Sequence, residues 1–176
     1  LAFKLNENNA SNLYVRQFVE HGGQEILDSL IEVSGSENVF ILGEIFGKGV
    51  QDLSYGMQAP TFRIFDIFLG GPSTGAYAGY FDMIKLLKDT NAYMRDHDIE
   101  VVAETVPVLF QGRYSPNAME NYTTGTESVS GKSMNIREGI VMRPAFERYD
   151  NELGRVILKS VSEQYLLRKG DTTEFN

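Results

Sequence analysis

Four charged residues lie inside otherwise apolar segments of this 176-residue chain. Glu44 occurs in ILGEIFGKGVQ, Asp66 in FRIFDIFLG, Glu138 in REGIVMRP and Lys159 in VILKSVS. A charge within an apolar strand is costly unless it is paired or binds a ligand. One such residue is more often a charge at a strand edge than a catalytic group. Four in this order are candidates for a functional site.

The charge of the chain is unevenly distributed. The net charge of −8 argues at first against a nucleic-acid partner. Residues 132–169, however, contain eight basic and five acidic residues, a net charge of +3 that leaves −11 for the rest. Phosphate chemistry is therefore expected in the last quarter of the chain.

The composition excludes several classes of site. The chain has no cysteine, which rules out a disulfide framework, a thiolate zinc site and a cysteine nucleophile. Its two histidines, His21 and His97, are too few for a histidine-based metal site. No apolar run approaches the roughly 20 residues that cross a bilayer, and the start shows no signal pattern. We interpret the protein as intracellular, cytoplasmic or nuclear, without a membrane partner.

The segments that must position the charged residues alternate irregularly between helix and strand. Periodicity predicts one helix over residues 13–20, a second that follows Gly22-Gly23 and ends near residue 33, and a third over residues 80–95. Strands are predicted for NVFILGEIFG, for residues 61–69, and for REGIVMRP and RVILKSVS. Residues 100–110 are predicted to be extended, and Pro107 suits a strand end or an edge rather than a central strand. Ser115-Pro116 indicates a helix start, and residues 123–133 indicate a surface loop. The fold class is α+β, with largely antiparallel sheets.

The same apolar segments resemble the motifs of a known family. GEIFGKGVQDLSYG resembles nucleotidyltransferase motif III as written in RNA ligases, FRIFDIFLGG motif IIIa, REGIVMRP motif IV and VILKSVSEQYLLRKG motif V. VPVLFQGRY and the end RKGDTTEFN are similar to RNA ligases in which an OB domain precedes a carboxy-terminal adenylyltransferase domain. Single motifs are weak, but the ordered set is strong. The resemblance runs from about Phe40 to the last residue.

The resemblance implies a fold and a reaction. The fold is the nucleotidyltransferase (adenylation) domain of the ATP-grasp-like ligase type, with antiparallel sheets flanked by helices. In the reaction, a lysine attacks the α-phosphate of ATP and releases pyrophosphate. AMP then moves to an RNA 5′-phosphate, and a 3′-hydroxyl finally expels AMP. The implied cofactors are ATP (as AMP) and Mg²⁺ or Mn²⁺, and the implied partner is RNA with 5′-phosphate and 3′-hydroxyl ends.

The resemblance also assigns roles to individual residues. Glu44 matches the motif III glutamate at the nucleotide ribose, and Phe65 matches the motif IIIa aromatic that stacks on adenine. Glu138 matches the motif IV glutamate that helps to hold Mg²⁺, although a structural pairing with Arg137 or Arg143 is an alternative. Lys159 matches a motif V lysine that contacts the α-phosphate.

Further residues near these motifs allow more than one interpretation. Strand alternation puts Phe46 on the same face as Glu44, where it would border the nucleotide pocket, yet a core aromatic is the stronger interpretation. Asp66 should point away from Phe65 and form a structural hydrogen bond. Motif V often carries two lysines as K-x-K, and the earlier position here is Ile157. Either Arg155 takes the place of the missing motif V lysine, or this branch of the family uses a single lysine. Arg168 and Lys169 are RNA-phosphate contacts or part of a solvated basic tail.

No lysine of the chain fits the nucleophile motif. None of the seven lysines begins a K-x-(D/H/N)-G sequence, the motif I pattern of the family. We therefore expect residues 1–176 to be the C-terminal part of one nucleotidyltransferase domain carrying motifs III, IIIa, IV and V, without the OB domain and the motif I strand. The missing N-terminal portion of the same protein is an expected partner. A sheet edge left unpaired should lower solubility or cause association.

Two other functions remain open from the sequence. An mRNA guanylyltransferase or a DNA ligase belongs to the same superfamily, although the FDI form of motif IIIa and the RKGDTTEFN end favour an RNA ligase. A non-catalytic module that grips RNA ends through a degenerate nucleotide pocket would explain the absent lysine.

Overall fold

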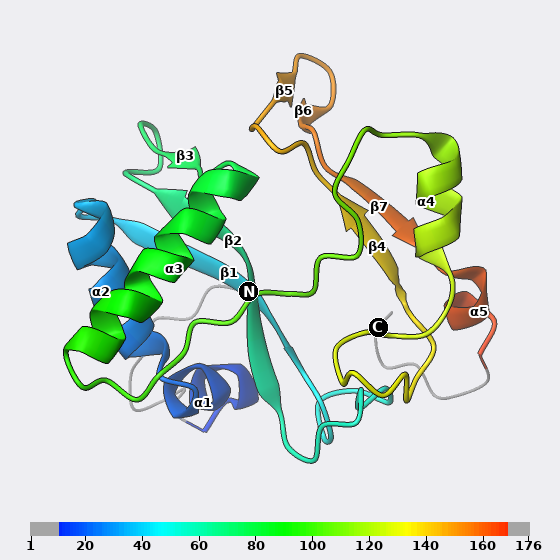
Figure 1. Cartoon of the computed structure of the whole chain (residues 1–176), viewed down its shortest axis with the longest axis horizontal. Coiled ribbons are helices and arrows are strands. Elements are labelled where there is room, and N and C mark those ends of the chain that lie inside the picture. The colour runs from blue at the N-terminus through cyan, green and yellow to red at the C-terminus, as the bar shows by residue number, and fades with distance from the viewer. Residues whose placement is uncertain (1–10, 169–176) are drawn as a thin grey trace. The chain divides into compact units, whose positions relative to one another are not determined.

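The computed structural model describes residues 11–168, which form two compact units (Figure 1). The first unit comprises residues 11–45 and 61–105, and the second comprises residues 46–60 and 106–168. The chain therefore leaves the first unit at the last residue of β1, forms part of the second, and returns with β2. Helices and antiparallel strands occur in both units, as an α+β fold requires.

The first unit combines three helices with a three-stranded sheet. The helices are α1 (Leu13–Glu20), α2 (Gly23–Ser34) and α3 (Tyr80–Asp96). The strands β1 (Val39–Phe46), β2 (Thr61–Leu69) and β3 (Ala76–Tyr77) lie in the order β1-β2-β3, and β2 pairs with β3 antiparallel. The predicted helices and the first two predicted strands are confirmed to within a few residues.

Local sequence explains where these helices begin and end. The Asn12 side chain accepts a hydrogen bond from the backbone N–H of Tyr14 at 2.9 Å and caps the start of α1. Gly22 and Gly35 flank α2 with φ values of 70° and 65°, a left-handed conformation that glycine adopts without steric cost. The two glycines thereby limit α2 to twelve residues.

The core of the first unit lies where α2, α3 and β2 meet. Its fully buried members are Ile26 and Leu30 from α2, Ile64 and Ile67 from β2, and Met94 from α3. On α2 the buried Ile26 and Leu30 belong to the apolar face that the sequence predicted, whereas on α3 the buried residues include Met83 and Met94, and the predicted Phe81 is exposed. This packing holds β2 firmly, and β2 carries Phe65 and Asp66.

The extended stretch at residues 100–110 is not a strand. It makes a single bridge between Thr105 and Ile64, in which the Ile64 N–H donates to the Glu104 carbonyl at 2.8 Å. The Asn91 side chain forms two hydrogen bonds with the backbone of Ala103, at 2.8 and 3.0 Å. A side chain of α3 thus satisfies backbone groups that a neighbouring strand would otherwise engage.

The second unit contains two short helices and two antiparallel strand pairs. Helix α4 (Pro116–Thr123) begins at the predicted N-cap Ser115, whose hydroxyl accepts from the Ala118 N–H. β4 (Gly139–Met142) pairs with β7 (Leu158–Val161), and β5 (Tyr149–Asp150) pairs with β6 (Gly154–Arg155). Helix α5 (Glu163–Leu166) follows β7.

The loop after α4 is less exposed than the sequence predicted. Glu127, within the expected surface loop at residues 123–133, is only 3% exposed. Its carboxylate accepts hydrogen bonds from the backbone N–H groups of Ser130 and Met134, each at 2.9 Å. A buried carboxylate therefore organises this loop from within, which composition alone does not reveal.

In the part of the chain that the structure describes, no helix is both long and apolar enough to cross a membrane.

Candidate active site

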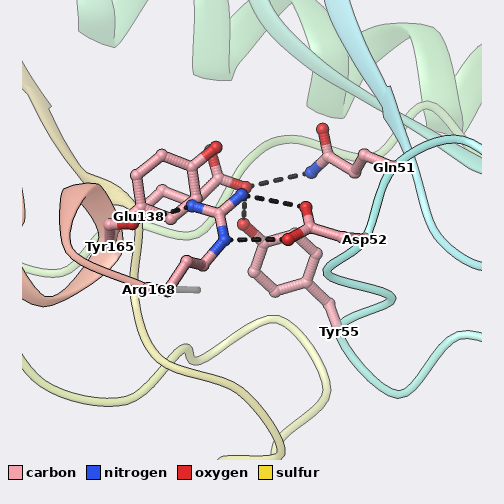
Figure 2. Close-up of polar contacts among 6 residues, drawn as sticks. All are labelled: Gln51, Asp52, Tyr55, Glu138, Tyr165 and Arg168. Carbon is pink, nitrogen blue, oxygen red and sulfur yellow. Dashed lines mark hydrogen bonds and ion pairs between the residues drawn. The ribbon is translucent and has the colours of Figure 1, made fainter. Parts of the chain in front are cut away.

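A polar cluster of the second unit surrounds Glu138, just before β4 (Figure 2). The Gln51 amide donates to Glu138 Oε1 at 2.9 Å, and the Tyr55 hydroxyl donates to the same oxygen. The Glu138 backbone carbonyl accepts from the Ser162 N–H at 2.8 Å, which ties it to the end of β7. Two hydrogen bonds thus hold one oxygen of the carboxylate, and a third holds the backbone of the same residue.

Tyr55 reaches Glu138 from the loop between β1 and β2. Its ring is buried and meets Phe46 edge-on, with centroids 5.7 Å apart. Both belong to a small core with Leu53 and Tyr165. Tyr55 has a φ of 50°, which is uncommon for a bulky residue and indicates that the surrounding packing determines its backbone.

A second polar contact anchors the same loop. Arg168 donates two hydrogen bonds to the carboxylate of Asp52, at 2.8 and 2.9 Å, and lies 3.5 Å from the centre of the Tyr165 ring. The hydrogen bonds from Arg168 lower the pKa of Asp52 and outweigh its partial burial. Arg168 is therefore not part of a solvated tail, and its guanidinium group is already bound to Asp52 rather than available to an RNA phosphate. Lys169 lies outside the described residues.

Glycine is required next to Glu138. A Cβ on Gly139 would lie 2.2 Å from the backbone oxygen of Ser160 on the paired strand. The glycine therefore allows β4 and β7 to approach at the point where β4 begins. On the helix side of this pair, the Thr123 hydroxyl bonds to that of Ser160 at 2.7 Å.

Lys159 lies on β7 opposite Val141 and is exposed. Lys159 and Val161 share one face of β7 because side chains alternate along a strand. Val161 packs against the core that contains Tyr55. Lys159 therefore lies on the face of β7 that borders this core at Val161.

The alternative partners considered for Glu138 are engaged elsewhere. Arg137 donates to the carbonyls of Tyr122, Thr124 and Thr126 at the end of α4. Arg143 donates to Glu147 at 2.9 Å. The interpretation of Glu138 as a structural partner of either arginine is wrong in this structure.

Arg155 is also committed to a carboxylate. It donates to both oxygens of Glu147 at 2.8 Å, so that two arginines share one carboxylate whose side chain is largely buried. The hydrogen bond from Arg155 is the largest influence lowering the pKa of Glu147, ahead of the opposing effect of burial. This pairing argues against Arg155 as a substitute for the second motif V lysine, and Ile157 offers no cation.

In the first unit, Glu44 and Phe65 lie on the neighbouring strands β1 and β2. Phe65 is 38% exposed, while Ile64 and Asp66 on either side are buried. Phe65 and Asp66 thus point to opposite faces, as predicted. Glu44 is exposed, and Phe46, at the end of β1, is only 5% exposed in the core around Tyr55. That burial favours the core interpretation of Phe46 over its predicted place at a nucleotide.

The surroundings of Glu138 suit it as the single protein ligand of a hard divalent cation. Glu138 Oε2 has no hydrogen-bond partner among residues 11–168, whereas Oε1 accepts two hydrogen bonds. Within the same residues no group of three or more His, Cys, Asp or Glu side chains gathers. One carboxylate supplemented by water and phosphate oxygens is a usual arrangement for Mg²⁺.

Sequence reasoning missed four residues of this cluster: Gln51, Asp52, Tyr55 and Tyr165. The first three belong to the motif III string, and Tyr165 belongs to the motif V string. Their place in those strings was therefore an available signal. The hydrogen bonds of Gln51, Asp52 and Tyr55 cross more than 80 residues of sequence and could not be inferred from spacing.

A profile of the RNA ligase family matches residues 3–161, and a comparison with curated proteins found no match. Three solved structures of Naegleria gruberi RNA ligase share the fold: one with PPi (TM-score 0.61, 19% identity), a lysine-to-alanine mutant with ATP and Mn (0.62, 19%), and an apo aspartate-to-alanine mutant (0.63, 18%).

The alignments cover 93% of this chain but only 42%, 42% and 41% of those ligases, respectively. The chain thus spans about two fifths of their length. At these identities the structures establish the fold, and the family profile, which covers most of the chain, establishes the family. The chain belongs to the RNA ligase family.

Proposed function

We propose that this chain forms the part of an ATP-dependent RNA ligase that binds the adenylate, the divalent metal and the reacting phosphates. Family membership supports the class of reaction, and the partly open carboxylate of Glu138 is the observation that carries the assignment of chemistry. The Naegleria gruberi ligases were solved with ATP and Mn or with AMP and Mn, which supports the same cofactors here.

In this proposal the nucleotide binds to the first unit. Phe65 presents an accessible ring from a strand that is held rigidly by the buried Ile64 and Ile67. A ring fixed in this way can stack on adenine without losing much conformational freedom. Glu44, on the neighbouring strand, would accept hydrogen bonds from the ribose hydroxyls.

The second unit supplies the charges for phosphoryl transfer. Glu138 would bind Mg²⁺ or Mn²⁺ through an oxygen, and the metal, when bound, would neutralise phosphate charge. Lys159 would contact the α-phosphate. Its ammonium is exposed, and no ion pair within residues 11–168 engages it.

The proposal assigns no nucleophile to these 176 residues, because none of the seven lysines begins a motif I sequence. A further portion of the same protein would supply the lysine that forms lysyl-AMP. We therefore expect no protein–AMP adduct when the chain is incubated with radiolabelled ATP and Mg²⁺. A covalent adduct on any of its lysines would contradict this assignment.

Nucleotide binding tests the proposal directly. We expect ATP, measured by calorimetry in the presence of Mn²⁺, to bind more tightly than GTP. Phe65→Ala should weaken ATP binding about 5- to 150-fold, which corresponds to the roughly 1–3 kcal/mol of a base–aromatic stack. Phe81→Ala, on α3 and similarly exposed, is the matched control and should leave affinity unchanged. Equal losses in both variants would refute the role of Phe65.

RNA binding separates the ligase from its relatives. We expect nicked RNA duplex to bind in preference to nicked DNA, with affinity falling steeply between two salt concentrations because phosphate contacts release counterions. Tight RNA-end binding without any ATP binding would instead favour the non-catalytic module. GTP and DNA preferences would favour a guanylyltransferase and a DNA ligase, respectively.

A further inference from the structure

The two hydrogen bonds to Glu138 converge on one oxygen. Gln51 and Tyr55 both donate to Oε1, and Oε2 has no such partner within residues 11–168 (Figure 2). A carboxylate that is fixed at one oxygen cannot rotate freely about its last bond. Its second oxygen therefore points in a defined direction, which is the property that a metal ligand requires.

The donors are themselves held in place. The buried Tyr55 ring packs against Phe46 and belongs to the same core as Leu53 and Tyr165. Its backbone, with φ of 50°, is strained for a bulky residue and persists only where the surroundings determine it. Such an outlier beside a candidate site residue is a reason to look for a positioning role.

The loop that carries both donors has a second attachment. Asp52, adjacent to Gln51, forms the two hydrogen bonds with Arg168, which also lies over the ring of Tyr165. The loop is thus fixed to the segment after β7 through Arg168 and to the segment before β4 through Glu138. These two segments flank the β4–β7 pair that carries Lys159.

We propose that Tyr55 and Gln51 are positioning residues that orient Glu138 so that Oε2 binds the divalent cation. This inference rests on the proposed metal role of Glu138. Hydrogen bonds to a ligating carboxylate commonly set its orientation, and removing one typically weakens metal binding about 10- to 100-fold. The motif III string thereby acts on the motif IV carboxylate as well as at the nucleotide.

Paramagnetic broadening by Mn²⁺ measures this role without any need for catalysis. The ¹⁵N-labelled chain would be titrated with Mn²⁺ alone, and an apparent Kd taken from the loss of the Gly139 amide signal. We expect Tyr55→Phe and Gln51→Leu each to raise this Kd about tenfold or more. Tyr122→Phe, in α4 of the same unit, is the matched control and should leave the Kd unchanged. Thermal unfolding of each variant would be recorded in parallel.

The outcomes distinguish the positioning role of Tyr55 and Gln51 from the metal-binding role of Glu138. If Glu138→Gln abolishes the broadening while Tyr55→Phe and Gln51→Leu retain the original Kd, the positioning inference is overturned and the metal role stands. A lower Tm without a change in Kd would mean that the hydrogen bonds serve stability alone. If the unmodified chain shows no broadening near Gly139, or Glu138→Gln leaves it intact, the metal role fails and the inference fails with it.

Discussion

The carboxylate of Glu147 allows the sharpest quantitative prediction. It accepts hydrogen bonds from Arg143 and Arg155, and the side chains of all three residues are between 15% and 17% exposed. Replacing Glu147 with Gln would remove the negative charge that two largely desolvated guanidinium groups share. Removing one partner of a fully buried ion pair costs about 3–5 kcal/mol. Because this triad keeps some solvent contact, we expect about 2–3 kcal/mol.

Urea unfolding at neutral pH would measure this free energy, with thermal unfolding as a second probe. For a chain of this size a loss of about 2–3 kcal/mol corresponds to a fall in Tm of roughly 4–12 °C. A double-mutant cycle with Arg155→Gln isolates the pair, and we expect a coupling free energy of at least about 1 kcal/mol. A coupling near zero would refute the argument.

The same cycle decides the function of Arg155. If Arg155 is structural, Arg155→Gln should lower stability and leave the ATP affinity of the folded protein unchanged. A loss of ATP affinity without a loss of stability would instead support Arg155 as the substitute for the second motif V lysine. Lys159→Met provides the contrast, because it should weaken ATP binding while leaving stability nearly unchanged.

Three further outcomes follow from the structure. Gly139→Ala should destabilise the protein by about 2–3 kcal/mol in urea unfolding, since the new Cβ would clash with the Ser160 backbone. Burial works to raise the pKa of Glu127, but hydrogen bonds from Ser130 and from loop N–H groups prevail and lower it. The ionised Glu127 carboxylate therefore stabilises the fold above its ordinary pKa of 4.5, and this contribution is lost as pH falls through the lower pKa of the folded state. Between pH 6 and pH 3, the free energy of unfolding should therefore fall less in Glu127→Gln than in the unmodified chain. Asp52→Asn, which removes the charge partner of Arg168 at a partly exposed site, should cost no more than about 1 kcal/mol in unfolding and should lessen the acid sensitivity of stability.

The sequence was sufficient for the parts of the fold that depend on local pattern. Helices α1, α2 and α3 and strands β1 and β2 follow from apolar periodicity bounded by glycine, and α4 begins where Ser115-Pro116 predicted. These features depend on neighbours within a few residues, and such interactions are visible in the order of amino acids. Residues 100–110 form one bridge to β2 rather than a regular edge strand, and Asn91, on α3, hydrogen-bonds to the backbone of this stretch instead.

For the site, the sequence determined which residues to examine and the tertiary structure decided how they are used. Glu44, Phe65, Glu138 and Lys159 were identified from motif strings, and the family match agrees with those strings. Only the folded chain shows that Tyr55 and Gln51 hold one oxygen of Glu138, that Arg155 is engaged by Glu147, and that Phe46 is buried. The physical reason is that a side chain's pairing and burial depend on partners far away in sequence. Residue type and spacing specify which group is present, whereas the neighbours brought together by packing set its orientation and its protonation.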